Sequence, residues 1–188
     1  MAGGVDIIQM REKDRSQEEL IKLGKRLSSL CKSKGVTFIV NDDPYIAKEV
    51  GADGVHLGQE DIRRVSVREA RRILGPGKII GVSTESERQV EDANKEDVDY
   101  IGYGPVFRTA VKDKCVGTKD VGRILKISKK PVVFIGGITL SNIDELLNRG
   151  ARNISLIRAI TEADDIAGAA GNFRKKLDDA EERACGKF

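Results

Sequence analysis

The stretch Ile7-Ile8-Gln9-Met10-Arg11-Glu12-Lys13-Asp14 opens as an apolar run and closes as a mostly charged one. A short apolar run is typical of a strand that is buried in a sheet. The polar residues after it can face a ligand if several strand ends converge on one site. We therefore expect this stretch to be a strand that leads into a binding site, beside the ends of further strands.

Short apolar segments alternate with helical patterns along the rest of the chain. Helical periodicity is clearest over residues 16–34, 66–74 and 164–184. Segments with this alternation, repeating at about 20 to 25 residues, form parallel strands joined by helical crossovers. Seven such strands are predicted, over residues 5–10, 36–40, 54–57, 78–82, 100–103, 131–135 and 152–157.

Local signals predict where several helices begin and end. Gly35 is expected to end the first helix, and Pro44 suits the first turn of the second. Thr84 and Glu87 have the spacing of a capping box for the helix after residues 78–82. Ser141 is expected to cap the helix after residues 131–135.

Polar or glycine residues follow every predicted strand, which favours a closed (β/α) barrel over an open sheet with a single crevice. Barrels of eight strands often bind phosphate after strands seven and eight, whereas the matching Gly136-Gly137 and Ile157-Arg158 follow strands six and seven here. We therefore predict one domain over residues 1–188, an α/β barrel of TIM (β/α)8 type that lacks its first strand and most of its first helix. Residues 1–4 would be the tail of that helix.

The composition excludes several classes of protein. With 188 residues, 39% hydrophobic and 34% charged, the chain has the make-up of one soluble globular domain. The net charge of +3 is spread among 30 acidic residues, without a basic stripe for nucleic acid. Neither a bilayer-spanning run nor a signal pattern is present, so we expect no membrane partner and a cytoplasmic location. Homo-oligomerisation stays open.

Carboxylates at two adjacent strand ends, Asp42 and Asp61, suggest a metal site. Two carboxylates can share a hard cation such as Mg²⁺ and leave its other positions to water and phosphate oxygens. The alternative is that Asp42 or Asp43 caps a helix and Asp61 starts one, because Asp is a preferred cap.

Basic residues near these carboxylates suggest a phosphorylated ligand. Arg11, Lys13 and Lys112 could surround a polyphosphate, although each alone could equally be a solvated surface charge. The amides of Gly136-Gly137 could approach a second phosphate, or the pair could be a tight turn. His56, the single histidine, is expected to be packed or hydrogen-bonded. The residues thus suggest group transfer from a diphosphate to a phosphorylated acceptor.

Motifs over nearly the whole chain are shared with one known family. They are Gln9-x-Arg11-Glu12-Lys13, Asn41-Asp42, the run Gly-Ala-Asp-Gly-Val-His-Leu-Gly-Gln-Glu-Asp from Gly51 to Asp61, Gly81-Val82-Ser83-Thr84, Gly104-Pro105-Val106-Phe107-x-Thr109 with Lys112, and Ile135-Gly136-Gly137-Ile138. With them the chain resembles the thiamine-phosphate synthase family.

The resemblance implies a transferase with two small-molecule substrates. It would join 4-amino-2-methyl-5-hydroxymethylpyrimidine diphosphate to 4-methyl-5-(2-hydroxyethyl)thiazole phosphate, giving thiamine phosphate and pyrophosphate. In that family Mg²⁺ and basic residues draw off the pyrophosphate, and the thiazole nitrogen captures the remaining pyrimidine-methyl cation.

The resemblance also implies a role for each matching residue. Asp42 and Asp61 would hold Mg²⁺, and Ser83 would contact the pyrimidine. The diphosphate would be held by Gln9, Arg11, Lys13, Asn41 and Lys112. The thiazole phosphate would lie against Thr109, Gly136, Gly137, Ile157 and Arg158. The expected catalytic residues are Arg11, Lys13, Lys112 and Ser83.

The chain departs from the family pattern in three places. One hydroxyl is lost in Thr109-Ala110-Val111-Lys112, where the family usually has Thr-x-Thr-Lys. Arg158 stands where many members have Ser, and it either adds a phosphate contact or points away. The absent first strand would leave an exposed edge. Two alternatives therefore stay open: a thiazole tautomerase, and a non-catalytic or truncated phosphate-binding barrel.

Overall fold

The computed structural model of the chain describes residues 1–12, 14–109 and 114–186. It contains one parallel sheet whose strands follow one another in sequence order. They are β1 (Ile7–Met10), β2 (Thr37–Asn41), β3 (Gly54–Leu57), β4 (Ile79–Thr84), β5 (Tyr100–Tyr103), β6 (Val132–Ile135) and β7 (Asn153–Ser155). Within the described ranges, β1 and β7 are the two edges of the sheet, as the sequence predicts.

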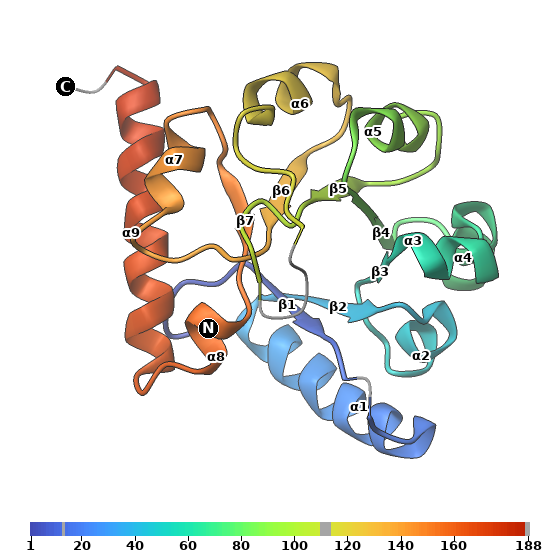
Figure 1. The fold of residues 1–188 in the computed structure, drawn as a ribbon. Coiled ribbons are helices and arrows are strands. Elements are labelled where there is room, and N and C mark those ends of the chain that lie inside the picture. Colours follow the sequence, from blue (N-terminus) through green and yellow to red (C-terminus); the bar gives the residue numbers. More distant parts are fainter. Residues whose placement is uncertain (13, 110–113, 187–188) are drawn as a thin grey trace.

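The sheet is curled, and helices surround it on the outside (Figure 1). The helices are α1 (Gln17–Lys34), α2 (Pro44–Glu49), α3 (Gln59–Arg64), α4 (Val67–Leu74), α5 (Glu87–Ala93), α6 (Val121–Ile127), α7 (Ile143–Leu147), α8 (Arg158–Thr161) and α9 (Ile166–Ala184). This arrangement confirms the predicted α/β fold of TIM type.

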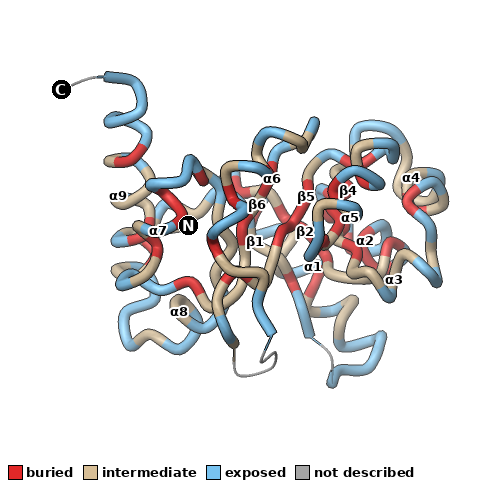
Figure 2. The backbone as a smooth tube through the Cα atoms, turned by 45° about the horizontal axis from the view of Figure 1, so that its top comes forward, coloured by how far each residue is buried: buried red, intermediate tan, exposed pale blue. Residues whose placement is uncertain are grey.

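Buried residues concentrate in the strands and on the helix faces that touch them (Figure 2). Phe38, Ile39 and Val40 of β2 are each at most 2% exposed, so both faces of this strand are covered. A continuous apolar run is the sequence pattern of such a parallel strand. Burial of side chains of this kind contributes roughly 1.5–3 kcal/mol each, so the packing of strands against helices is a main source of stability.

The first helix begins and ends where the sequence predicts. The Ser16 side chain accepts from the Glu19 N–H, and the Glu19 carboxylate accepts from the Ser16 N–H at 2.9 Å, which forms a capping box. Gly35 adopts φ 64° at the other end, a left-handed conformation that costs glycine little.

Two other predicted caps are wrong. β4 continues to Thr84, whose buried hydroxyl donates to the Gly102 carbonyl at 3.1 Å. Ser86 instead caps α5 by accepting from the Gln89 N–H. Asn142 rather than Ser141 is the N-cap residue of α7. At Thr84 the hydrogen bond across to β5 outweighs the local capping pattern, and at α7 the cap lies one residue later, at Asn142, whose side chain closes the preceding loop.

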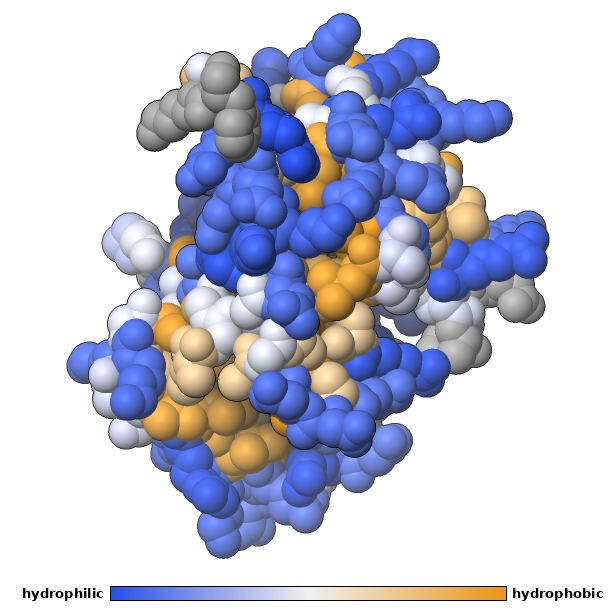
Figure 3. Space-filling view, turned by 90° about the vertical axis from the view of Figure 1, so that its left-hand side faces the viewer, coloured by the Kyte–Doolittle hydropathy of each residue, from blue (hydrophilic) through white to orange (hydrophobic). Residues whose placement is uncertain are grey.

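The N-terminal residues pack against the last helix. Residues 1–4 form a turn closed by the Gly4 N–H on the Met1 carbonyl, not the helical tail that the sequence suggests. Arg174 of α9 donates to the Gly4 carbonyl at 3.0 Å and pairs with Asp6. The side of the molecule that carries α9 also shows apolar areas between its polar side chains (Figure 3).

Among the described residues, no helix combines the length and the apolar character that a membrane span requires.

Gly54 is required by the close approach of β3 and β4. A Cβ added there would lie 2.1 Å from the Ile79 carbonyl oxygen, which is backbone and cannot move aside alone. We expect Gly54→Ala to lower the free energy of unfolding by about 1–3 kcal/mol, the usual cost of overpacking. Urea denaturation measures this change.

Gly171→Ala in α9 is the matched control, because nothing lies within 4 Å of its added Cβ. It should raise the free energy of unfolding by about 0.5–1 kcal/mol through helix propensity. Equal effects of the two substitutions would contradict the account of Gly54.

Candidate active site

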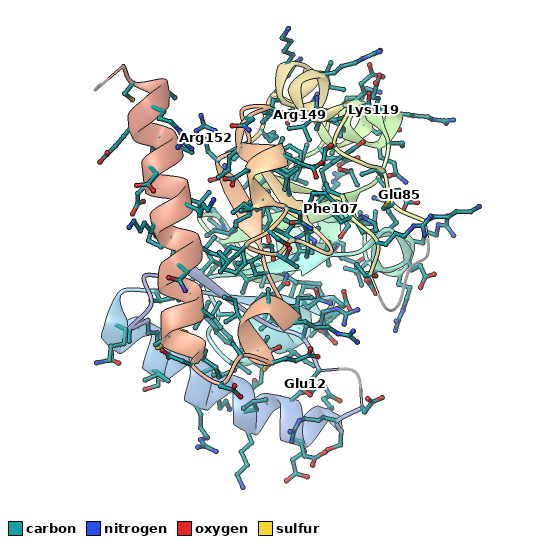
Figure 4. All side chains as sticks on the ribbon, turned by 60° about the vertical axis from the view of Figure 1, so that its left-hand side comes forward. Glu12, Glu85, Phe107, Lys119, Arg149 and Arg152 are labelled. Carbon is teal, nitrogen blue, oxygen red and sulfur yellow. The ribbon has the colours of Figure 1, made fainter. Side chains whose placement is uncertain are left out.

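The parallel sheet brings the carboxyl ends of its strands, and the loops after them, to one side of the barrel. In Figure 4, Glu85 in the loop after β4 lies on the opposite side of the barrel from Arg152, which directly precedes β7. Most of the sequence-predicted site residues follow strand ends on the side of Glu85. Lys13 and Lys112, two of the predicted diphosphate ligands, lie outside the described residues.

Asp42 directly follows β2 in a strained backbone conformation. Its φ is 72°, and it is the only non-glycine residue with positive φ among those described. Its N–H donates to the His56 carbonyl at 2.7 Å, and the Asp43 N–H donates to the Asn41 carbonyl at 2.9 Å. These bonds close a tight three-residue turn around Asp42, a conformation that persists only where its surroundings impose it. Such strain is common at functional sites.

The carboxylates of Asp42 and Asp61 lie side by side. Burial and the adjacent Asp61 carboxylate raise the pKa of Asp42 to about 6. Asn41 and the charge of Arg11 act in the opposite direction on this pKa, so both side chains are close to the pair. Asp42, Asp61, Arg11 and Asn41 therefore come together from three separate strand ends.

The alternative assignment of these aspartates to helix starts is correct in part. Asp43, not Asp42, caps α2, because its carboxylate accepts from the N–H groups of Tyr45 and Ile46 at 2.8 and 3.0 Å. Asp61 lies in the first turn of α3, and its carboxylate accepts from the Gly58 N–H at 3.2 Å. Asp42 thus has no capping role, and Asp61 keeps a second carboxylate oxygen for other contacts.

Ser83 lies on β4 within a chain of polar side chains. Its hydroxyl is 2.9 Å from His56 Nε2, and its carbonyl accepts from the Gln59 side chain at 2.5 Å. The other ring nitrogen of His56, Nδ1, lies 2.8 Å from the Tyr100 hydroxyl. Burial lowers the pKa of His56 to about 4, so the imidazole is neutral at neutral pH.

The sequence reasoning did not assign Gln59 or Tyr100 to the site. Gln59 falls within one of the shared motifs, whereas Tyr100 lies at the start of its strand, where only the fold shows that its ring turns inward.

The Gly136-Gly137 pair lies against the loop after β5. The N–H groups of Val106 and Phe107 donate to the carbonyls of Ile135 and Gly136 at 2.9 and 3.0 Å. A Cβ at Gly137 would lie 2.4 Å from the Arg108 carbonyl, so the backbones touch just before Thr109. The structure therefore sets the glycine pair against the segment that leads into Thr109.

The Asn142 side chain closes the loop after β6: its Nδ2 donates to the Gly137 carbonyl at 2.9 Å, and its Oδ1 accepts from the Thr139 N–H. Both glycines have positive φ, 102° and 63°, which only glycine adopts readily.

Ile157 and Arg158 form the start of the short helix α8 after β7. The exposed Arg158 side chain pairs with Glu162, the residue that follows α8, at 3.4 Å. Gln9 lies on β1 in register with Ile39 of β2.

Fold and strand-end chemistry together define an α/β barrel protein with a polar site at the carboxyl ends of its strands. Comparison with known proteins narrows this class. The family described as thiamine monophosphate synthase matches residues 1–160 of the chain. The chain belongs to this family, which confirms the resemblance predicted from the sequence motifs.

Individual relatives agree with this assignment. A thiamine-phosphate synthase of Persephonella marina is 43% identical over 168 residues, covering 88% of this chain and 79% of the relative. A thiamine-phosphate synthase of Halalkalibacterium halodurans is 38% identical and covers 94% of this chain and 83% of the relative. The solved structure of thiamine phosphate pyrophosphorylase from Pyrococcus furiosus superimposes with a TM-score of 0.87 at 36% identity, over 95% of this chain and 86% of that one.

The raised pKa of Asp42 predicts how stability depends on pH. Its folded-state value of about 6 exceeds the ordinary 3.8, so the folded state takes up a proton before the unfolded state does as the pH falls. This carboxyl should therefore make the metal-free protein more stable as the pH falls from about 7.5 to about 5.

Asp42→Asn should abolish this gain, because it removes the titrating group while Asn still tolerates positive φ. The difference in urea midpoint between wild type and Asp42→Asn, followed across this pH range, measures the effect. A difference that does not change with pH would show that Asp42 is not held beside a second carboxylate.

Proposed function

We propose that this chain is a thiamine-phosphate synthase that joins hydroxymethylpyrimidine diphosphate to thiazole phosphate and releases pyrophosphate. The observation that carries the proposal is the pairing of Asp42 and Asp61 beside Arg11 and Asn41, in a chain that belongs to this family. The cytoplasmic location stays a prediction from the sequence, and homo-oligomerisation stays open.

The paired carboxylates fit Mg²⁺. Burial and the repulsion of the adjacent Asp61 carboxylate raise the pKa of Asp42, and a hard divalent cation that prefers oxygen ligands would remove that repulsion. Within the described ranges no cluster of three or more such ligands occurs, and Mg²⁺ sites with one or two carboxylates and a substrate phosphate need no third. Bound there, Mg²⁺ would neutralise negative charge on the leaving pyrophosphate.

The remaining charged residues would hold the diphosphate. Arg11 can form two parallel hydrogen bonds to phosphate oxygens through its planar guanidinium. Asn41 is the last residue of β2 and Gln9 is the last but one of the adjacent strand β1, and both would add neutral donors. Lys13 and Lys112 are assigned to the same group from the sequence. Fixed donors of this kind act where charge develops in the transition state, and loss of one such donor from an enzyme active site typically costs about 3 kcal/mol.

The second substrate, the thiazole phosphate, would lie at the carboxyl ends of the later strands. The backbone around Thr109, Gly136 and Gly137 forms one contact region, and Ile157-Arg158 begins α8 nearby in the barrel order. We assign the thiazole phosphate to these backbone groups, with Ser83 at the pyrimidine.

The reaction then needs no general base. The bond between the pyrimidine methylene carbon and the diphosphate oxygen breaks, and both electrons leave with pyrophosphate. The lone pair of the thiazole nitrogen forms the new carbon–nitrogen bond. The residues of the chain bind, orient and compensate charge, and no proton has to move.

The two alternatives, a thiazole tautomerase and a non-catalytic barrel, differ from the proposal in residues or in turnover. A thiazole tautomerase would generally lack the metal carboxylates and the Gln9-x-Arg11-Glu12-Lys13 block, both of which this chain has. A non-catalytic barrel would bind phosphate without turnover.

The direct test is a reaction with both substrates and Mg²⁺. We expect pyrophosphate and thiamine phosphate in equal amounts, and neither product when Mg²⁺ is chelated. A protein with cooperative unfolding that binds phosphate but releases no pyrophosphate would be the non-catalytic barrel, and the proposal would fail.

The metal assignment is tested by replacing neighbouring aspartates. Asp42→Ala should lower kcat/KM by at least about a hundredfold, because a metal ligand is lost. Asp43→Asn is the matched control: it also removes one carboxylate charge, but Asn can still cap α2, so activity should be retained. Equal losses in the two variants would indicate a general effect of charge, not metal binding by Asp42.

A further inference from the structure

Three side chains from neighbouring strands are linked by hydrogen bonds into a continuous line inside the barrel, which we call the Tyr100–His56–Ser83 line. Tyr100 of β5 contacts Nδ1 of His56 on β3 at 2.8 Å, and Nε2 of His56 contacts the Ser83 hydroxyl on β4 at 2.9 Å. The line therefore runs from the barrel interior to a residue near the carboxyl end of β4. Neither His56 nor Tyr100 has a role in the site as described so far.

Gly81 makes the contact between His56 and Tyr100 possible. His56, Gly81 and Tyr100 are paired in register across β3, β4 and β5, so the two rings are two strands apart. Such strands lie about 10 Å apart, and the missing side chain between them lets the rings meet above β4. A Cβ at Gly81 would lie 2.1 Å from the Tyr100 ring.

The hydrogen-bond partners decide which ring nitrogen of His56 carries the proton. Tyr100 is largely buried, burial raises the pKa of its hydroxyl, and within the described residues its hydroxyl contacts no polar atom other than Nδ1. A buried hydroxyl needs an acceptor for its proton, so the Tyr100 hydroxyl donates to Nδ1. The neutral imidazole then has its proton on Nε2, and Nε2–H donates to the Ser83 oxygen.

The proton on Nε2 of His56 determines which hydrogen bonds Ser83 can make. Its oxygen already accepts a hydrogen bond from His56, and its carbonyl is held by Gln59. The hydroxyl proton cannot point at Nε2, which is itself protonated, and is left for a ligand.

We propose that Tyr100 and His56 are positioning residues that make Ser83 a hydrogen-bond donor to the substrate. The atom it recognises must be an acceptor with a lone pair, and the chemistry that fits is an unprotonated ring nitrogen of the heteroaromatic substrate. This inference rests on the proposed function for the identity of the substrate, but the order of the protons does not depend on it.

The order of the protons can be measured without any substrate. His56 is the only histidine in the chain, so nitrogen-15 labelling of histidine gives one pair of ring signals in an NMR spectrum. In the wild-type protein at neutral pH we expect a protonated, pyrrole-type Nε2 and an unprotonated, pyridine-type Nδ1. In Tyr100→Phe the preference should weaken, and both nitrogens should move towards intermediate shifts. A proton on Nδ1 in wild type, or unchanged signals in Tyr100→Phe, would overturn the proposal.

Kinetics test the effect on the substrate. Tyr100→Phe should lower kcat/KM for the pyrimidine diphosphate about tenfold, the worth of one well-oriented hydrogen bond, and leave KM for the thiazole phosphate unchanged. Tyr103→Phe is the matched control, because it makes the same change at another buried tyrosine of β5. Equal losses in both variants, or no loss in Tyr100→Phe, would contradict the positioning role. An inactive wild type would refute the proposed function, and the NMR measurement would still decide the order of the protons.

Discussion

The parallel pairing of seven strands in sequence order is the constraint on which the rest of the structure depends. It places every carboxyl strand end on one side of the barrel, so residues from distant parts of the sequence become neighbours without any special loop. The pairing needs close backbone contact, as at Gly54 against Ile79, and covered faces, as along β2. The burial that stabilises the strands therefore also assembles the site.

The site itself works against stability. Asp42 adopts positive φ and lies beside a second carboxylate, and each feature costs free energy in the folded state. Asp42 is held there by its N–H, which donates to the His56 carbonyl. The neighbouring Asp43 caps α2. Unfavourable carboxylate pairing of this kind is what a divalent cation can relieve, which links the strain to the proposed function.

Much of the fold follows from local pattern. Alternating apolar and helical segments predict all seven strands and the barrel class, because parallel strands need continuous apolar runs and crossovers. The wrong predictions concern features that tertiary contacts determine or helices that are very short. Thr84 has the spacing of a cap, but its hydroxyl bonds across to β5, and the short helices α3, α6 and α8 were not predicted.

In the candidate site, too, some residues can be predicted from the sequence and others depend on tertiary contacts. Family motifs predict Asp42, Asp61 and Gly137, and the structure brings the two aspartates together and sets the glycine loop against the segment before Thr109. The line from Tyr100 through His56 to Ser83 could not be predicted from sequence, since it depends on Gly81 leaving space between two strands. No local signal marks that space.

The central claim is that Asp42 and Asp61 act together as a Mg²⁺ site. Isothermal titration calorimetry of Mg²⁺ at about pH 6 and about pH 8, in buffers that differ in ionisation enthalpy, tests it directly. The account predicts binding at both pH values, with protons released at the lower pH only, and loss of this release in Asp42→Asn. Absence of binding, or proton release that is unchanged in Asp42→Asn, would contradict it.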